Sequence, residues 1–397
     1  TGVQLPEYHN GLGYMNLISM IFQIEIIRQT FMKGCNGKMS DINLLIIEEP
    51  EAHTHPQMQY IFIKNIKQLL NAPLEAKGET RKIQSIISTH SSHIVSESEF
   101  SDIKYMSRIG NEVKAKNLKD LQKEYDNDEQ QWYTFLKHYL TLNRSELFFA
   151  DKAIFIEGDT ERILLPIMMK KIDQEEPCNE AENELPLCKQ NISVIEVGAY
   201  SHIFGRLINF IGLEKAVVFT DLDYGKKGGN GHVEKAKYDG SEKMLTSNNA
   251  LKEYFTNLKD GNDLKVNKLL SLTEKQKKFT WNESTSKWLQ NDKGNMRISF
   301  QLKEKEYQCR TFEDNFFVIN KEFMRENEPH ILGLKKGKLR SYLDDNISAF
   351  ELAEDGIASK ATFAVEIIYN SKKVDGKEFC GWDIPQYIKD GLLWIRK

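Results

Sequence analysis

Apolar and polar positions follow two different periods along the first hundred residues. Asn16–Thr30 carries apolar residues at helical spacing, whereas Asn43–Ile47 and Ile83–Ile87 are short continuous apolar runs. A period near 3.6 indicates an amphipathic helix, and a short apolar run indicates a buried strand. We therefore predict an α/β domain over residues 1–100, followed by a charged helical connector over residues 101–150.

From residue 151 the chain alternates buried strands with helices. The predicted strands are Ala153–Ile156, Ser193–Val197 and Ala216–Thr220, and the predicted helices are Thr160–Ile172 and His202–Ile211. Parallel strands joined by helices require right-handed crossovers. The fold class predicted for residues 151–397 is therefore α/β, with a doubly wound parallel sheet. Residues 224–310 are rich in lysine and weakly periodic, so we expect an insertion there.

The composition excludes several classes of protein. The length of 397 residues allows two or three domains, and the net charge of −4 gives no global attraction to nucleic acid. The five cysteines form no CxxC pair, which is typical of a reducing compartment. There is neither a membrane-length apolar run nor a secretory leader, so we expect a cytoplasmic protein with no membrane partner. A start at Thr1 rather than Met leaves open that the chain is a fragment.

Two of the predicted strands end in carboxylates. AIFIEGDTE (Ala153–Glu161) carries Glu157 and Glu161, and VVFTDLD (Val217–Asp223) carries Asp221 and Asp223. The carboxyl ends of parallel strands share one edge of a sheet, where ligands bind. Hard oxygen ligands at that edge favour two Mg²⁺ or Mn²⁺ ions and phosphate-ester chemistry. The alternative is that these acids only cap helices and turns, the role expected of Asp159 and Thr160.

The first domain carries a second polar constellation. The strand Leu44–Ile47 delivers Glu48 and Glu49, the strand ending at Ile87 delivers Ser88–His90, and the segment His9–Gly13 precedes a helix. Adjacent acids can hold a metal and orient water, and helix amides can bind phosphate. LLIIEEPEAHTHPQ followed by STHSSHI resembles the ABC-type head of recombination and chromosome-maintenance ATPases.

That resemblance implies nucleotide-binding roles in four places: Glu48 and Glu49 as the Walker B acids, Glu51–His55 as the D-loop, His90 as the switch histidine, and Gly11 and Gly13 near the signature motif. No GxxxxGK[ST] loop occurs; the nearest segment, Gly333–Lys338, lacks the spacing. The chain therefore resembles the back half of such an ATPase. We expect ATP as a cofactor only where the missing N-terminal part is present, and no ATP hydrolysis by this chain alone.

EGDTE and TDLD resemble the Toprim domain of topoisomerases, primases and repair nucleases. An ABC-type head followed by Toprim resembles the OLD (overcoming lysogenization defect) family, which includes Gabija-type anti-phage nucleases. The resemblance extends from about residue 5 to residue 370, apart from the lysine-rich insertion. It implies a further acidic metal ligand at Glu313 in RTFEDNF, with Asp314 as a second candidate. It also implies an active-site lysine at Lys360 in SKATFA, which either stabilises developing charge or activates water.

The resulting hypothesis is a metal-dependent DNA endonuclease regulated by an ATPase head. Glu157, Asp221 and Asp223 would hold one ion, with Glu161 and Glu313 completing the second. The resemblance implies DNA as substrate, a homodimer or higher oligomer formed through the head, and a partner protein of a defence system. Two alternatives stay open: a topoisomerase- or primase-like activity, and a non-catalytic assembly or sensor subunit.

Further lysines and an arginine form candidate contacts to a nucleic-acid backbone. They are Lys226–Lys227, Lys335–Lys336, Lys338 and Arg340. The competing interpretation is an ordinary solvated face.

Overall fold

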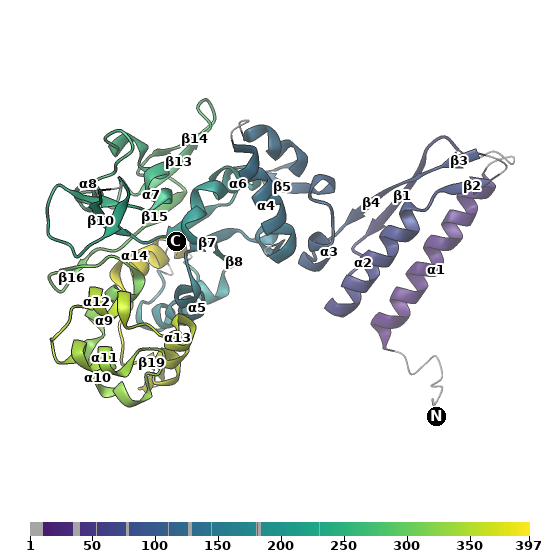
Figure 1. Cartoon of the computed structure of the whole chain (residues 1–397). Coiled ribbons are helices and arrows are strands. Elements are labelled where there is room, and N and C mark those ends of the chain that lie inside the picture. Colours follow the sequence, from purple (N-terminus) through teal and green to yellow (C-terminus); the bar gives the residue numbers. More distant parts are fainter. Residues whose placement is uncertain are drawn as a thin grey trace. The chain divides into compact units, whose positions relative to one another are not determined.

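The computed structural model describes residues 11–34, 40–52, 54–76, 79–109, 111–125, 129–143, 145–179, 181, 184–229 and 231–397. The chain folds into two compact units, Thr1–Phe149 and Ala150–Lys397 (Figure 1). We describe each unit by itself.

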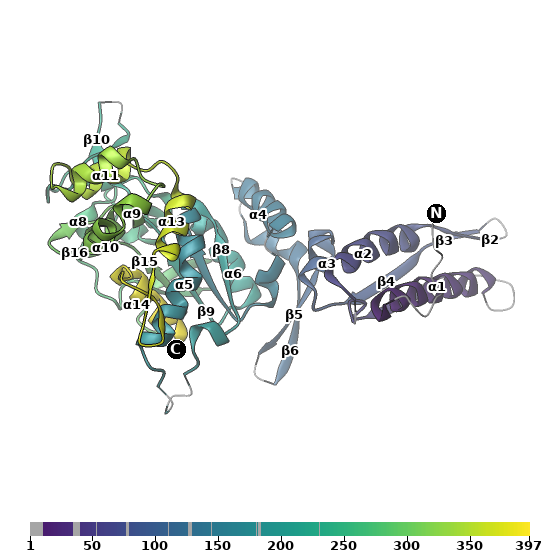
Figure 2. The same ribbon diagram turned by 90° about the horizontal axis from the view of Figure 1, so that it is seen from below.

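Unit 1 begins with two long helices and a parallel strand pair. Its elements are α1 (Leu12–Lys33), β1 (Asn43–Glu48), α2 (Pro56–Asn71), β2 (Leu74–Ala76), β3 (Glu79–Arg81), β4 (Ile83–Ser88), α3 (Ser92–Ser96), η2 (Phe100–Asp102), β5 (Lys104–Ile109), β6 (Glu112–Asn117), η3 (Leu118–Glu124), α4 (Gln130–Asn143) and η5 (Ser145–Phe149). The predicted helix and both predicted strands are confirmed. Strands β5 and β6 run side by side as a hairpin (Figure 2).

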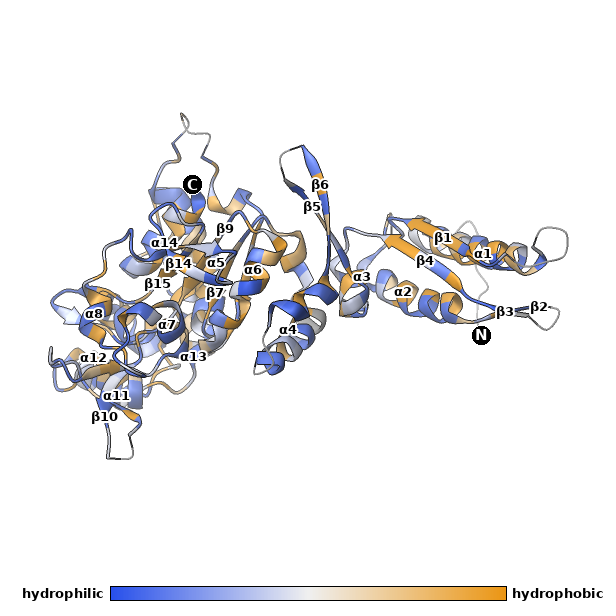
Figure 3. Cartoon of the chain, turned by 90° about the horizontal axis from the view of Figure 1, so that it is seen from above, coloured by the Kyte–Doolittle hydropathy of each residue, from blue (hydrophilic) through white to orange (hydrophobic). Residues whose placement is uncertain are grey.

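The parallel pair β1–β4 has one covered face. Along β1 buried and exposed residues alternate, so Leu45 and Ile47 pack into the core with α1 and α2, whereas Leu44 and Ile46 face outward. This is the period-2 pattern of a strand packed on one side. Figure 3 shows β1 as a largely hydrophobic ribbon and β4 as a ribbon of mixed hydropathy beside the two helices.

Unit 2 is built on a mainly parallel sheet. In the described part of the unit this sheet has six strands in the order β14-β13-β15-β9-β7-β8. The four strands β15, β9, β7 and β8 run parallel, and β13 and β14 are antiparallel to them or to each other. Their bounds are β7 (Lys152–Ile156), β8 (Ile192–Glu196), β9 (Lys215–Phe219), β13 (Lys278–Asn282), β14 (Lys287–Gln290) and β15 (Met296–Ser299).

Helices cover both faces of this sheet, as expected for a doubly wound fold. On one face Ile154 and Val217 share a core with α5 (Asp159–Glu175) and α14 (Gln386–Arg396). On the other face Phe155 contacts Phe204, with ring centroids 5.6 Å apart. Phe204 belongs to η8 (Gly198–Phe204), which leads into α6 (Gly205–Ile211). The predicted α/β class is therefore confirmed for this unit.

The expected insertion, residues 224–310, supplies part of the central sheet. Its strand β15 pairs in parallel with β9, with Val218 opposite Ile298. The other elements of this segment are β10 (Tyr224–Lys227), β11 (Val233–Lys235), β12 (Met244–Thr246), α7 (Asn249–Tyr254), η9 (Thr256–Leu258), α8 (Val266–Leu270), β16 (Lys303–Glu304) and β17 (Tyr307–Gln308). We did not predict β15, because buried polar residues interrupt its apolar run.

The C-terminal part of unit 2 is mainly helical. It contains α9 (Phe312–Ile319), α10 (Lys321–Glu326), η10 (Glu328–His330), α11 (Lys336–Leu343), α12 (Ala349–Asp355), α13 (Lys360–Tyr369), β18 (Lys372–Val374), β19 (Lys377–Cys380) and α14; the short η7 (Leu187–Lys189) precedes β8. Within the described ranges no helix has the length and apolar content needed to cross a bilayer.

Candidate active site

The carboxyl ends of β7 and β9 bring two of the predicted acids together. The strands pair in parallel, with Phe155 opposite Val218, so Glu157 and Asp221 emerge at the same edge. The backbone N–H of Asp221 donates to Glu157 Oε1 at 3.1 Å, and the Thr220 hydroxyl donates to the same oxygen. The predicted meeting of the two strand tips is thus present in the structure.

Glu161 reaches the same site from the first turn of α5. Its side chain is buried, and its Oε2 lies close to Gly158, the residue that precedes the helix. The expected capping role of Asp159 and Thr160 is wrong. Gly158 occupies the N-cap position, Asp159 pairs with Arg162 at 2.7 Å, and the buried Thr160 hydroxyl donates to another acid of the site.

Helices α9 and α13 supply an acid and a lysine. Glu313 lies in the first turn of α9, and its Oε1 is 2.9 Å from Lys360 Nζ and 3.0 Å from Thr160 Oγ1. Lys360 is the first residue of α13. Asp314, the second acidic candidate in this segment, instead accepts hydrogen bonds from the backbone N–H groups of Arg310 and Thr311 and holds the start of α9. Glu313 is therefore the acid that faces the cluster.

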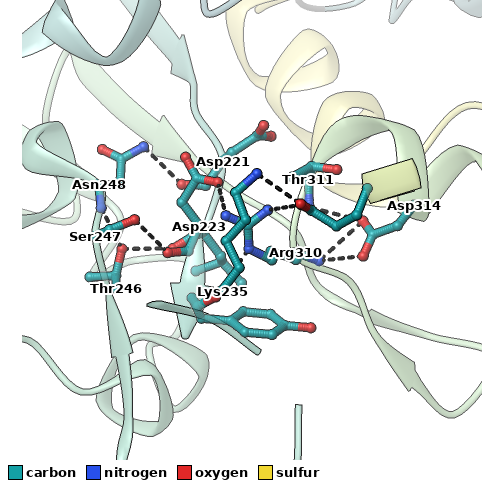
Figure 4. Close-up of polar contacts among 12 residues, drawn as sticks. Asp221, Asp223, Lys235, Thr246, Ser247, Asn248, Arg310, Thr311 and Asp314 are labelled. Atoms are coloured by element: carbon teal, nitrogen blue, oxygen red, sulfur yellow. Dashed lines mark hydrogen bonds and ion pairs between the residues drawn. The ribbon is translucent and has the colours of Figure 1, made fainter. Parts of the chain in front are cut away.

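Asp223 is paired with a buried arginine. Arg310 Nη2 lies 2.7 Å from Asp223 Oδ1 (Figure 4). Nη1 of the same guanidinium lies 3.0 Å from Glu354 Oε1. Its Nε donates to the Tyr224 carbonyl at 3.0 Å. Asp223 adopts a left-handed backbone conformation with φ 42°. The ion pair with Arg310 holds its carboxylate in place.

Burial and mutual repulsion control the charge of the cluster. Burial raises the pKa of Glu161 to about 8, and the charge of Glu313 adds to the effect. Burial and the neighbouring Glu157 raise the pKa of Asp221 well above its usual value, and burial also raises the pKa of Glu157. Lys360 behaves oppositely, because burial disfavours its charge but the Glu313 carboxylate raises its pKa overall. These carboxylates therefore need further positive charge to ionise together at neutral pH.

The donor set fits a divalent cation. The described hydrogen bonds anchor a single oxygen of each acid: Oε1 of Glu157, Oδ1 of Asp221 and Oε1 of Glu313. Carboxylate oxygens are the ligands that Mg²⁺ and Mn²⁺ prefer. In the arrangement seen, no three acidic, histidine or cysteine side chains of the described residues stand close enough to chelate an ion.

Two buried amides of the site were missed in the sequence. Gln301 is fully buried and donates to Asp221 Oδ1 at 2.5 Å, while its carbonyl oxygen accepts from the Leu222 N–H at 2.8 Å. Asn248 donates to Glu157 Oε1 at 2.9 Å. Neither lies at the end of a predicted strand. For Asn248 a usable signal was present, since an Asn directly before a helix is a common N-cap.

The ATPase-like motif residues of unit 1 gather at the ends of β1 and β4. Glu49 follows β1 with φ 42°, and its Oε1 lies 3.2 Å from His90 Nε2, with both side chains exposed. Glu51 Oε1 accepts from Thr89 Oγ1 at 2.8 Å and from the His90 N–H at 2.6 Å. Glu48 ends β1 opposite Ser88. The motifs predicted to act together thus lie together at the ends of these two strands.

The glycines near the predicted signature motif lie at the start of α1. Gly11 precedes the helix and Gly13 lies in its first turn. Asn16, one turn later, donates to the Ala52 carbonyl at 3.0 Å, so this end of α1 lies beside the turn that follows β1. His9 and Asn10 fall outside the described residues.

Four of the six candidate backbone-contacting residues of unit 2 have acidic partners in the structure. Lys226 and Lys227 pair with Asp239 and Asp263 at 2.5 and 2.8 Å. In the C-terminal part, the ion pairs are Lys338 with Asp355 at 3.4 Å and Arg340 with Glu328 at 3.1 Å. A role in binding DNA would compete with these pairs.

Comparison with known proteins identifies two domain families. Residues 1–95 match the AAA ATPase domain, and residues 148–223 match the TOPRIM domain of overcoming lysogenization defect protein-like proteins. The second match contains Glu157, Glu161, Asp221 and Asp223. The fold and the site therefore define a protein in which an AAA-type ATPase region is followed by an OLD-like Toprim domain.

Two relatives are similar to the chain over its whole length or over about half of it. Endonuclease GajA of Bacillus cereus (strain HuB5-5) is 30% identical over 412 residues, covering 100% of this chain and 54% of the relative. The Old nuclease of Escherichia phage P2 is 25% identical over 218 residues, covering 54% of this chain and 33% of that protein. The chain is similar to OLD-family proteins in its Toprim domain and spans about half the length of its GajA relative.

A solved structure adds a weaker likeness. The C-terminal region of the Burkholderia pseudomallei OLD protein is 20% identical and covers 62% of this chain and 98% of that structure. Its TM-score of 0.32 is too low to support an argument about the fold.

Proposed function

We propose that the chain carries the cutting site of a metal-dependent DNA endonuclease that hydrolyses phosphodiester bonds, in the setting of anti-phage defence. The observation that carries the proposal is the acidic cluster at the carboxyl edge of β7 and β9, where three helices add the buried Glu161 and Glu313 and the partly exposed Lys360 to the half-buried Glu157 and Asp221. The relatives named an endonuclease and a nuclease support the same assignment.

The cluster divides into ligands and charge-stabilising groups. We assign Glu157, Asp221 and Asp223 to one cation, and Glu161 and Glu313 to a second. Bound Mg²⁺ or Mn²⁺ would supply an activated water and neutralise the phosphate. Lys360 stays protonated, because its pKa is raised by Glu313. It therefore suits electrostatic stabilisation of the leaving oxygen rather than the removal of a proton.

Plasmid cleavage tests the proposal. Purified protein should nick or cut supercoiled plasmid when Mg²⁺ or Mn²⁺ is present, and Asp221→Ala should abolish cleavage because it removes a half-buried, central proposed ligand. Asp292→Ala is a matched control, since Asp292 is exposed on the same unit. Cleavage by Asp221→Ala at the wild-type rate would remove the basis of the assignment.

The ATPase-like region is proposed to regulate the nuclease and to mediate homodimerisation. Glu48, Glu49 and His90 would act on ATP only together with a phosphate-binding loop, which these 397 residues lack. Light scattering of the purified chain measures the oligomer, and a monomer at micromolar concentration would contradict dimerisation through this region. A defence-system partner stays a prediction.

A further inference from the structure

Three consecutive residues hold the backbone of the Asp221–Asp223 segment. We name Thr246–Asn248 the TSN segment. The Thr246 hydroxyl donates to the Leu222 carbonyl at 2.6 Å, and Thr246 is fully buried. The Ser247 N–H and hydroxyl both donate to the Asp223 carbonyl, at 3.0 and 2.9 Å (Figure 4). Side chains of the TSN segment thus donate hydrogen bonds to successive backbone carbonyl groups of the Asp221–Asp223 segment.

Asn248 extends the same pattern to a side chain of the acidic cluster. Its Nδ2 lies 2.9 Å from each of three acceptors, which are the Asp221 carbonyl, Thr220 Oγ1 and Glu157 Oε1. Its Oδ1 accepts from the Leu251 N–H at 3.1 Å and caps α7. One buried amide therefore fixes a helix start on one side and a carboxylate on the other.

The local fold explains how this contact arises. Strand β10 begins directly after Asp223 and pairs with β12, placing Tyr224 opposite Thr246. The chain then turns from β12 into α7 within two residues. Asp223 has φ 42°, so the turn it forms follows neither a helix nor a strand ladder. Without the TSN segment the carbonyl groups of this turn would lack hydrogen-bond donors, which would lower stability.

We propose that the TSN segment is a positioning device for the metal site. It sets the backbone path that aims Asp221 and Asp223 at the same space, and it presents the free oxygen of Glu157 to a cation. The inference rests on the proposed function, because it concerns the acids assigned there as metal ligands. Residues of this kind typically change metal affinity or activity by about 10- to 100-fold when they are replaced.

Thr246 offers a test that separates hydrogen bonding from packing. Thr246→Val keeps the shape but removes the hydroxyl, whereas Thr246→Ser keeps the hydroxyl and removes a methyl group. We expect Thr246→Val to bind Mn²⁺ about tenfold more weakly in a calorimetric titration of the full chain, with Thr246→Ser close to wild type. If the residue served only packing, Thr246→Ser would be the more damaging change and Thr246→Val would match wild type, which would overturn the proposal.

Asn248 offers a second test that preserves the helix cap. Asn248→Ser retains a side-chain acceptor for α7 but lacks the amide donors to Glu157. We expect its Mn²⁺ affinity to fall about 10- to 100-fold while α7 keeps its cap. Asn249→Ala, at the exposed neighbouring asparagine, should bind as wild type does. Equal Mn²⁺ affinity in Asn248→Ser and wild type would overturn the role of Asn248.

The Mn²⁺ titration also distinguishes a failure of the positioning role from a failure of the proposed nuclease function. A wild-type chain that binds Mn²⁺ but leaves plasmid intact would refute the nuclease proposal, while the affinities of the variants would still decide the positioning role. A wild-type chain that binds no Mn²⁺ would refute the metal site and the positioning role together.

Discussion

Replacing Glu161 by glutamine should stabilise unit 2 in the absence of metal and weaken its response to metal. The Glu161 side chain is 6% exposed, and burial with the charge of Glu313 raises its pKa from 4.5 to about 8. Below pH 4.5 both the folded and the unfolded chain hold the proton, so there is no penalty. Between pH 4.5 and about 8 the unfolded chain loses the proton and the folded chain keeps it. The folded state therefore loses about 1.4 kcal/mol per pH unit until the loss levels off above pH 8.

At pH 7 this reasoning gives a penalty of about 3 kcal/mol that Glu161→Gln removes. For a unit of this size each kcal/mol corresponds to about 2–4 °C in melting temperature. We therefore expect Glu161→Gln to melt roughly 6–12 °C above wild type at pH 7 in EDTA, with a much smaller difference near pH 5. The variant should gain less from added Mn²⁺, because a proposed ligand has been removed.

Tryptophan fluorescence suits this measurement, because four of the five tryptophans lie in unit 2. Glu283→Gln, at an exposed site in the same unit, is the matched control and should not shift the melting temperature. If metal-free Glu161→Gln melted at or below the wild-type temperature at both pH 7 and pH 8, the electrostatic account of the cluster would be wrong.

Three further predictions follow from the same geometry. Lys360→Met should lower kcat for plasmid cleavage by about 100-fold or more with little change in KM, because the charge opposite Glu313 is lost. Arg310→Lys should lower stability by about 2–4 kcal/mol and weaken Mn²⁺ binding, because lysine cannot hold Asp223, the Tyr224 carbonyl and a second acid in one plane. Mn²⁺ affinity should rise about tenfold per pH unit from pH 6 to about 8 and then level off, since the metal displaces a proton from the cluster.

Each of these has a result that would contradict it. A rise in KM alone for Lys360→Met would place the lysine in DNA binding, and Lys293→Met, at an exposed lysine, should leave both constants unchanged. Wild-type melting of Arg310→Lys in thermal denaturation would show that the buried ion pair does not organise the site; Arg340→Lys is the exposed control. A calorimetric affinity independent of pH would mean that no proton is displaced.

The sequence was most informative where a candidate site residue comes directly after a predicted strand. Glu157 and Asp221 lie just beyond strands whose continuous apolar runs reveal their burial, so their shared edge follows from parallel pairing alone. Strand β15 escaped prediction for the opposite reason. It has only four residues, and two of them, Arg297 and Ser299, are polar but buried. Their burial is possible because Arg297 donates a hydrogen bond to the Ser299 hydroxyl and forms an ion pair with Glu274. Periodicity cannot recognise polar residues that are buried as partners.

The supporting side chains were hidden by distance along the chain. Asn248 lies 91 positions after Glu157, and Gln301 lies 80 positions after Asp221. An amide leaves no mark on hydrophobic patterning, and its donor role appears only when both segments have folded. Glu313 was accessible through family resemblance, whereas its placement in the first turn of a helix, beside Thr160, needed the structure.

The order of synthesis gives the helix α14 a particular importance. Gln301, which holds Asp221, also lies 3.3 Å from the hydroxyl of Tyr387 in α14, and Gly391 of α14 has no room for a side chain against Phe219 of β9. A ribosome makes every acid of the cluster before it makes this helix. The acids of the cluster are therefore synthesised before the helix that packs against Phe219 and contacts Gln301 through Tyr387.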